Sequence, residues 1–392
     1  MTAGASSPPA DAPAVPAAEI FGFTSAEVTA RVGAILESAG ERPFRIRQIR
    51  EWIYHKTPAE FEGMSDLPRR LRQRLGEELV LFPIQVQELK TSRDGTQKAL
   101  WARAAGGTIE SVLIPDRDRV TYCISTQAGC PVKCTFCATG YGGFQGQLRP
   151  AEIVGQVLAL RRITGTPPTN IVYMGMGEPL LNFDAVQRSL EILTAPDQVG
   201  FGARRITVST VGIPERIREL GELFPQVKLA LSFHAARDDL RDEIIPLNRK
   251  FPLSAVLDAV RDHTRATGKN ATFEYIVLPD VNDSEADARA VVERLRGIPS
   301  RINLIGFNPF PEAPYSKPAV QRLLTFRTWL ERRGYEGPVT IRRSRGEDIQ
   351  GACGQLSLLH AKELEPAPMD QKKDPGLGER SPGSKVGRKE KS

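Results

Sequence analysis

The sequence of 392 residues contains no apolar run close to the roughly 18 to 20 residues that a membrane-spanning helix needs. Its first 30 residues contain no lysine or arginine, so the basic start of a secretory signal peptide is missing as well. Cysteine is scarce, with five residues in total, which argues against a disulfide scaffold. We therefore expect a cytoplasmic protein that does not contact a membrane.

The remaining composition is that of an ordinary globular protein. Hydrophobic residues make up 40% of the chain and charged residues 26%, which is enough apolar material for a sizeable core. A length of 392 residues suggests two or three domains. The formal net charge of +6 favours an anionic partner such as a nucleic acid, although charge alone does not identify one.

Both ends of the chain have compositions that do not build a packed core. Residues 1–19 are rich in Ala, Pro and Ser, and residues 365–392 combine Pro, Gly, Ser and Lys. Segments of this kind bury too little apolar surface to fold, so we expect two disordered tails, the second of them basic.

Residues 20–82 are predicted to form a helical domain, which is a candidate RNA-binding domain. Thr24 can cap a first helix. A later apolar stripe with helical spacing contains Ile46, Ile49, Trp52 and Ile53. Residues 41–74 contain nine Lys or Arg against five acidic residues, including the cluster Arg69, Arg70, Arg72 and Arg74. The basic face is either a solvated helix surface or a patch for an RNA backbone, and composition does not separate the two.

The pattern changes to strands after this domain. In residues 83–115, three alternating runs separated by Gly-containing turns predict a small antiparallel β-meander extension. In residues 116–364, six short β-branched runs alternate with amphipathic helical segments: VTYCIST, NIVYMG, RITVST, VKLALSFH, TFEYIVL and RINLIGF. Repeated βα units predict an α/β fold, an open or closed barrel whose site lies at the carboxyl ends of parallel strands.

Four of the five cysteines fall within fifteen residues, and three of them form a C-x3-C-x2-C run at Cys130, Cys134 and Cys137. Three thiolates on one short loop can hold three irons of a cubane cluster and leave the fourth iron open. The alternative is a structural zinc site, but such sites usually have four ligands, often as two CxxC pairs, and this loop has no second pair. Cys123, within the preceding strand pattern, is a weaker candidate for a fourth ligand.

A C-x3-C-x2-C loop after the first strand of a βα barrel resembles that of the radical S-adenosylmethionine enzymes, in which the open iron binds S-adenosylmethionine. Further motifs follow the later strands: MGMGEPL at 174–180, ITVST at 206–210, LSFHA at 231–235, NPF at 308–310, RRSRGEDI at 342–349 and ACGQL at 352–356. Together these motifs resemble the RlmN family of RNA methyltransferases over residues 20–365. The resemblance implies a partial (β/α)6 radical SAM barrel.

The resemblance also implies the residues of the site. A [4Fe-4S] cluster would be held by Cys130, Cys134 and Cys137, and S-adenosylmethionine by Gly177, Glu178, Ser209, Ser232, Phe233, His234 and Asn308. Cys353 would carry the methyl group as S-methylcysteine, Cys123 would resolve the adduct through a transient disulfide with Cys353, and Glu110 would accept the ring proton. Judged without the resemblance, Glu110 is a polar residue in an alternating strand and Cys353 a small apolar one.

The implied reaction is methylation of carbon 2 of an adenosine, in the peptidyl-transferase region of 23S rRNA and 3′ of the anticodon in some tRNAs. This ring carbon is electron-poor and cannot attack the electrophilic methyl of S-adenosylmethionine, so a radical path is needed, with two S-adenosylmethionine consumed per methyl. The expected partners are 23S rRNA, tRNA and an electron donor such as flavodoxin or ferredoxin, and the protein is expected to be a monomer.

Two alternatives remain open from the sequence. Relatives called Cfr methylate carbon 8 of the same rRNA base and use the same set of cysteines. A noncatalytic RNA-binding protein with a structural zinc is an alternative of a different class.

Overall fold

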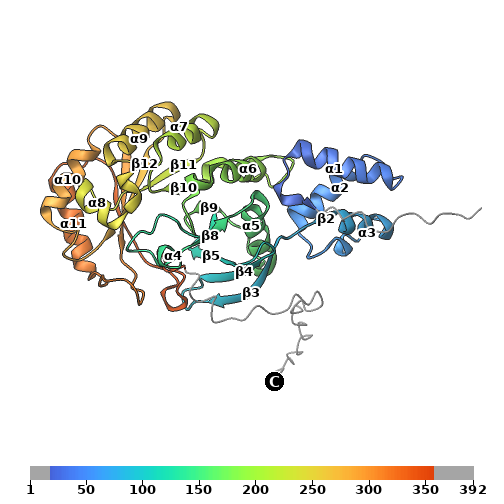
Figure 1. Ribbon diagram of the computed structural model, residues 1–392, viewed down its shortest axis with the longest axis horizontal. Helices are drawn as coiled ribbons and strands as arrows, with labels where there is room; N and C mark the ends of the chain where they lie inside the picture. Colours follow the sequence, from blue (N-terminus) through green and yellow to red (C-terminus); the bar gives the residue numbers. More distant parts are fainter. Residues whose placement is uncertain (1–17, 357–392) are drawn as a thin grey trace, which may run out of the picture.

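The computed structural model describes residues 18–356, which form an elongated body with a helical unit at one end (Figure 1). The predicted tails lie outside the described residues, except that Ala18–Glu19 forms strand β1 and pairs in parallel with β2 (Leu79–Val80). In residues 18–356, no helix is long and apolar enough to cross a membrane.

The N-terminal unit consists of α1 (Ser25–Ser38), α2 (Arg45–Arg50), a π-helical segment (Glu51–Lys56) and α3 (Arg69–Glu78). As predicted, Thr24 caps α1: its backbone N–H donates to the Glu27 carboxylate at 2.7 Å, in a capping box. Ile49 and Ile53 of the predicted stripe are fully buried. The unit docks on the rest of the chain, where Gln198 donates a hydrogen bond to the Tyr54 hydroxyl at 2.7 Å.

One ten-stranded sheet forms the centre of the molecule. Its antiparallel part contains β3 (Ile84–Thr91), β4 (Gln97–Arg103), β5 (Thr108–Asp116) and β6 (Arg119–Cys123). Its parallel part continues from β6 through β9 (Asn170–Tyr173), β10 (Ile206–Thr210), β11 (Lys228–Ser232), β12 (Ala271–Val277), β13 (Ser300–Gly306) and β14 (Val339–Arg342). All six predicted runs are strands, and β14 is an additional one.

Two features of the sheet refine the sequence predictions. The predicted meander forms, but β5 pairs with β6 along five residues, so the meander continues the main sheet. The strand order runs from β14 at one edge to β3 at the other, and these two edge strands do not pair with each other. The sheet is therefore open, which was one of the two predicted arrangements.

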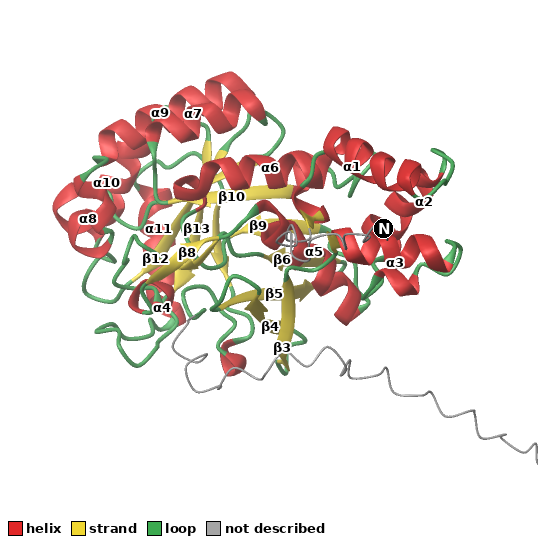
Figure 2. Cartoon of the chain, turned by 45° about the vertical axis from the view of Figure 1, so that its right-hand side comes forward, coloured by secondary structure: helices red, strands yellow, loops and turns green. Residues whose placement is uncertain are grey.

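Helices cover the outer face of the curved parallel part (Figure 2). They are α5 (Pro150–Thr164), α6 (Phe183–Thr194), α7 (Pro214–Leu223), α8 (Asp238–Ile244), α9 (Leu253–Thr267), α10 (Glu285–Leu295) and α11 (Val320–Arg332). Apart from α8, the apolar faces of these helices and the sheet form one continuous core that also includes the N-terminal unit. Leu240 and Ile244 of α8 belong to a second apolar cluster. The carboxyl ends of the parallel strands are left for loops, as the βα pattern predicts.

A small hairpin follows β6 at these carboxyl ends. Strands β7 (Gln127–Gly129) and β8 (Phe144–Gln147) pair in an antiparallel manner, and α4 (Ala138–Tyr141) lies between them. The backbone N–H of Cys130 donates to the Gly143 carbonyl at 3.0 Å. The segment with the three clustered cysteines is therefore held at both of its ends.

Candidate active site

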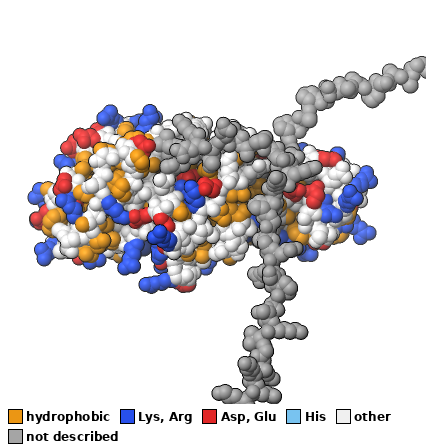
Figure 3. Space-filling view, turned by 90° about the horizontal axis from the view of Figure 1, so that it is seen from below, with side chains coloured by type: hydrophobic (Ala, Val, Ile, Leu, Met, Phe, Trp, Pro, Cys, Tyr) orange, Lys and Arg blue, Asp and Glu red, His pale blue; other side chains and the backbone are white. Residues whose placement is uncertain are grey.

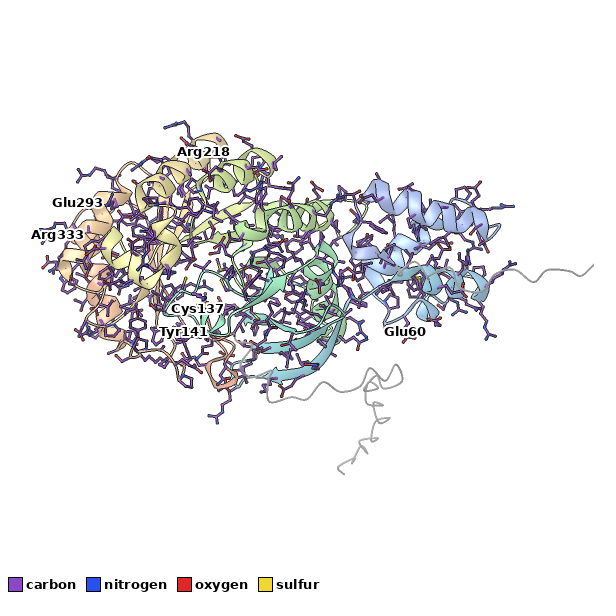
Figure 4. All side chains as sticks on the ribbon, in the orientation of Figure 1. Glu60, Cys137, Tyr141, Arg218, Glu293 and Arg333 are labelled. Atoms are coloured by element: carbon purple, nitrogen blue, oxygen red, sulfur yellow. The ribbon has the colours of Figure 1, made fainter. Side chains whose placement is uncertain are left out.

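The three cysteines of the C-x3-C-x2-C run line one cavity of about 160 Å³ at the carboxyl ends of the central strands. Figure 4 shows Cys137 inside the ring of helices, beside Tyr141. Burial, and then the nearby Cys137 thiolate, raises the pKa of Cys130 to about 12. Buried thiols that repel one another as thiolates need a strongly positive partner. An iron–sulfur cluster, which binds soft sulfur ligands, fits this set of donors.

The zinc alternative needs a fourth ligand beside the three clustered thiols, and Cys123 is the candidate from the sequence. Cys123 lies on β6 and does not line the cavity of the three clustered thiols. It lines a neighbouring cavity instead, which makes it a poor fourth ligand.

The turn after β9 forms one wall of the cavity. Gly177 has a φ of +99°, and a Cβ at this position would lie 2.5 Å from the Cβ of Gln127, so only glycine fits. The Glu178 carboxylate accepts backbone hydrogen bonds from Leu180 at 3.0 Å and from Val211 at 2.8 Å. Burial nevertheless raises the pKa of Glu178 above its usual value. Glu178 thus fastens the turn to the end of β10 and lines the cavity with an acceptor for a ligand amine.

Ser209, Ser232 and His234 line the same cavity from the ends of β10 and β11. The two serine hydroxyl oxygens lie 3.5 Å apart. Nδ1 of His234 accepts a hydrogen bond from the backbone N–H of Ile276 at 3.0 Å, which places the ring proton on Nε2. Burial, helped by the charge of Arg241, lowers the pKa of His234 to about 3. The imidazole is therefore neutral and can act as a donor toward the cavity.

The side chain of Phe233, which the sequence also assigns to the S-adenosylmethionine site, lies outside the cavity. Its ring is fully buried in the core and packs edge-on against Phe273, with the ring centroids 5.5 Å apart, and it does not line the cavity. Ser232 and His234 line the cavity, whereas the Phe233 side chain lies in the core. The expected contact of Phe233 with S-adenosylmethionine stays a prediction.

Cys123 and Cys353 line a second cavity, although 230 positions separate them in the sequence. Cys123 is buried at the end of β6, whereas Cys353 is exposed and lines both cavities. Burial, and then the charge of a Cys353 thiolate, raises the pKa of Cys123 to about 12. The structure therefore places Cys353 between the three clustered thiols and Cys123.

Asn308 belongs to the second cavity rather than the first. Its side-chain amide donates to the Cys353 carbonyl at 3.0 Å and accepts from the Ser344 hydroxyl at 2.7 Å. The Cys353 segment is held from the other side as well, because the backbone N–H of Ala138 donates to the Gly354 carbonyl at 2.7 Å. Asn308 thus holds the cysteine-bearing backbone, a role that sequence reasoning did not foresee.

Two charged residues that sequence reasoning left without a role lie in the site. Arg342 lines both cavities, and its guanidinium lies 3.7 Å from the buried carboxylate of Glu274. A Cys353 thiolate, and then Glu274, raises the pKa of Arg342. The signal for Glu274 was a single acidic residue within the apolar run TFEYIVL. The charge of Arg342 partly offsets the effect of burial on the pKa of Cys123.

Glu110 lies one strand away from Cys123, on β5. Val112 is the cross-strand partner of Cys123, and Glu110, two residues from Val112, shares its face of the sheet. Glu110 is only 3% exposed and does not line either cavity. Its carboxylate lies 2.8 Å from Nζ of Lys98. The predicted proton acceptor thus shares a face of the sheet with Cys123, one strand away, and does not line the site.

Comparisons with known proteins fit this fold and site. Residues 124–290 match the family model of the radical SAM superfamily, whose members use a [4Fe-4S] cluster and S-adenosylmethionine. Residues 20–81 match the ribosomal RNA large subunit methyltransferase N-terminal domain. The chain resembles, with 43% identity and a TM-score of 0.82, the crystal structure of a radical SAM methyltransferase from Sphaerobacter thermophilus, covering 88% of this chain and 100% of that one. The fold and site thus define a radical SAM methyltransferase.

Curated relatives identify the family within that class. A probable dual-specificity RNA methyltransferase RlmN from Thermotoga sp. (strain RQ2) is 44% identical over 330 residues, which cover 84% of this chain and 95% of the relative. The dual-specificity RNA methyltransferase RlmN of Marinobacter nauticus is 42% identical over 335 residues, covering 83% and 90%. The chain belongs to the RlmN family of RNA methyltransferases. This membership overturns the alternative of a noncatalytic zinc protein.

Proposed function

We propose that this enzyme methylates carbon 2 of an adenosine in the peptidyl-transferase region of 23S rRNA and of the adenosine 3′ of the anticodon in some tRNAs. The observation that carries the proposal is the position of Cys353, which lines the cavity of the three clustered thiols and the cavity of Cys123 at the same time. A methyl group on Cys353 would be within reach of both. The named specificity of the relatives supports the two RNA substrates.

Each residue of the site has a part in this reaction. Cys130, Cys134 and Cys137 would hold the [4Fe-4S] cluster, which would supply the electron for reductive cleavage of S-adenosylmethionine. Glu178, Ser209, Ser232 and His234 bind the polar groups of S-adenosylmethionine. Cys353 carries the methyl carbon that becomes joined to adenine. Cys123 then forms a disulfide with Cys353 and releases the product, while Glu110 accepts the ring proton.

Mass spectrometry of RNA nucleosides tests the proposal directly. RNA from a strain lacking the enzyme should gain 2-methyladenosine when incubated with the enzyme, S-adenosylmethionine and a reductant. The product 8-methyladenosine would show instead that the enzyme acts like Cfr. The match of residues 20–81 to the RNA methyltransferase N-terminal domain favours carbon 2.

We also propose that the enzyme is a monomer and takes electrons from flavodoxin or ferredoxin, which reconstitution with each purified donor would test.

The basic face of the N-terminal unit supports an RNA substrate. Of its nine cationic residues, five are exposed and, within the described chain, form no ion pair: Arg42, Arg47, Lys56, Arg69 and Arg70. Arg74, in contrast, pairs with Glu77 and Glu78. In Figure 3, Lys and Arg side chains project from the end of the molecule formed by this unit. Cations without a carboxylate partner are free to bind phosphates.

Replacing Arg69 and Arg70 with Glu is expected to weaken RNA binding and to lower the slope of log affinity against log salt by about 1 to 2. Cleavage of S-adenosylmethionine should stay near the wild-type rate, because the cavity is remote. A matched control replaces Arg204 and Arg205, two neighbouring exposed arginines at the amino end of β10. Unchanged RNA affinity in the first variant would identify the patch as an ordinary solvated surface.

Two exposed aromatic rings flank the cluster loop. Tyr141 is 41% exposed and ends α4, four residues after Cys137, and Phe144 is 46% exposed and pairs with Gly129, next to Cys130. Unpaired RNA bases stack on such rings. Tyr141→Ala should therefore raise the KM for RNA about tenfold and leave S-adenosylmethionine binding unchanged. Leu223→Ala, at a similarly exposed site on α7, is the control. An unchanged KM would exclude stacking at Tyr141.

A further inference from the structure

The β-meander contains a buried ion pair that the proposed reaction does not yet explain. Lys98 on β4 and Glu110 on β5 are 5% and 3% exposed, and Nζ of Lys98 lies 2.8 Å from Oε1 of Glu110. Lys98 is the cross-strand partner of Val112, and Glu110 is that of Leu100, so the two charges meet diagonally on one face of the sheet.

Stability alone does not account for Lys98. Removing two charges from water costs more than their attraction usually returns, and apolar side chains of similar volume would stabilise the sheet at least as well. The same meander also contains an ordinary ion pair, between Lys90 and Glu88, whose side chains are exposed to solvent at 3.3 Å separation. A lysine buried beside Glu110 therefore calls for a functional reason.

Lys98 makes a second contact that suggests this reason. Its ammonium donates to the backbone carbonyl of Gln350 at 3.3 Å, three residues before Cys353. Val112, the partner of Lys98 in β5, is also the partner of Cys123 in β6. One ammonium group thus contacts both the proposed proton acceptor and the segment of the proposed methyl carrier, two strands from Cys123.

We propose that Lys98 is a positioning residue for the removal of the ring proton, an inference that rests on the proposed function. Its ammonium, 2.8 Å from Oε1, fixes the direction of the Glu110 carboxylate that would accept the proton. Its bond to Gln350 keeps that carboxylate in a constant position relative to Cys353. The proposed proton acceptor and the proposed methyl carrier, which lie far apart in the sequence, are thereby held at a fixed position relative to each other.

The test compares Lys98→Met with Lys98→Arg and with Glu110→Gln in the full-length holoenzyme, incubated with tRNA transcript. Lys98→Met should still form 5′-deoxyadenosine at close to the wild-type rate. Methylated RNA should fall by about tenfold or more, and a covalent protein–RNA species should accumulate, because proton removal follows carbon–carbon bond formation. Lys98→Arg should restore most of the product. Lys90→Met, which removes the exposed cation of the same meander, is the matched control.

Three outcomes would contradict the inference, and they are distinguishable. In the first outcome, Lys98→Met forms as much methylated RNA as the wild type, while Glu110→Gln stops at the protein–RNA adduct. This result would exclude the role of Lys98 and keep that of Glu110. Wild-type product from Glu110→Gln would overturn the proposed proton acceptor, and Lys98 with it. Loss of 5′-deoxyadenosine in Lys98→Met would show that Lys98 only supports the fold. If Lys98 acts through Glu110, the double variant should be no slower than Glu110→Gln alone.

Discussion

Cys123→Ala should trap the enzyme on its RNA. Cys353 can still be methylated and joined to adenine in this variant, but no thiol remains to form the disulfide that breaks the carbon–sulfur bond. The expected product is a protein–RNA species that survives denaturing electrophoresis and disappears on nuclease treatment. Release of methylated RNA should fall to background.

Cys353→Ala is the matched variant, because the two cysteines line the same cavity. It should give neither methylated RNA nor adduct, since the radical finds no S-methyl group to act on. The structure adds a reason for the division of roles: Cys353 is exposed and reaches both cavities, whereas Cys123 is buried and reaches one. An adduct formed by Cys353→Ala, or full methylation by Cys123→Ala, would reverse the assignment.

Replacing Cys130, Cys134 or Cys137 singly with Ala should abolish both the brown colour of the anaerobically purified protein and the formation of 5′-deoxyadenosine. The three thiols line one cavity on one loop, so the loss of any one leaves too few ligands for the cluster. Cys123→Ala, which should keep its colour and its 5′-deoxyadenosine formation, is the control. Full reductive cleavage of S-adenosylmethionine by any of the three variants would contradict the ligand set.

The parallel strands could be predicted from the sequence because each is a short β-branched run between helical segments, and all six occur. Strand β14 was missed because it is a four-residue edge strand with little burial, so its sequence, VTIR, has no strong apolar pattern. The continuity of the meander with the main sheet was missed for another reason. It depends on the pairing of β5 with β6, which local sequence patterns do not specify.

Site residues that belong to a sequence motif could be predicted from the sequence. Residues that only tertiary contacts bring into the site could not. The cluster loop and Gly177 follow from spacing and from the need for a glycine at a tight turn. Lys98 and Glu274 did not stand out, because a single charge in a strand is ordinary until its burial is known. Asn308 binds the Cys353 backbone, a contact between two segments far apart in the sequence that no sequence pattern reveals. Its expected contact with S-adenosylmethionine stays a prediction.

The attachment of the Cys353 segment has a consequence for how the enzyme is made. Ser92 and Asp94, in the β3–β4 turn, bind Asp348 and the backbone of Gly346 with hydrogen bonds of 2.5 and 3.0 Å, across more than 250 positions of sequence. Closing so long a loop is entropically costly, so these contacts form only after the sheet has brought the two segments together. During synthesis the ribosome releases this segment after the cluster loop. A nascent chain can thus fold its cluster loop well before Cys353, the proposed methyl carrier, has been added, and the proposed chemistry can begin only after that.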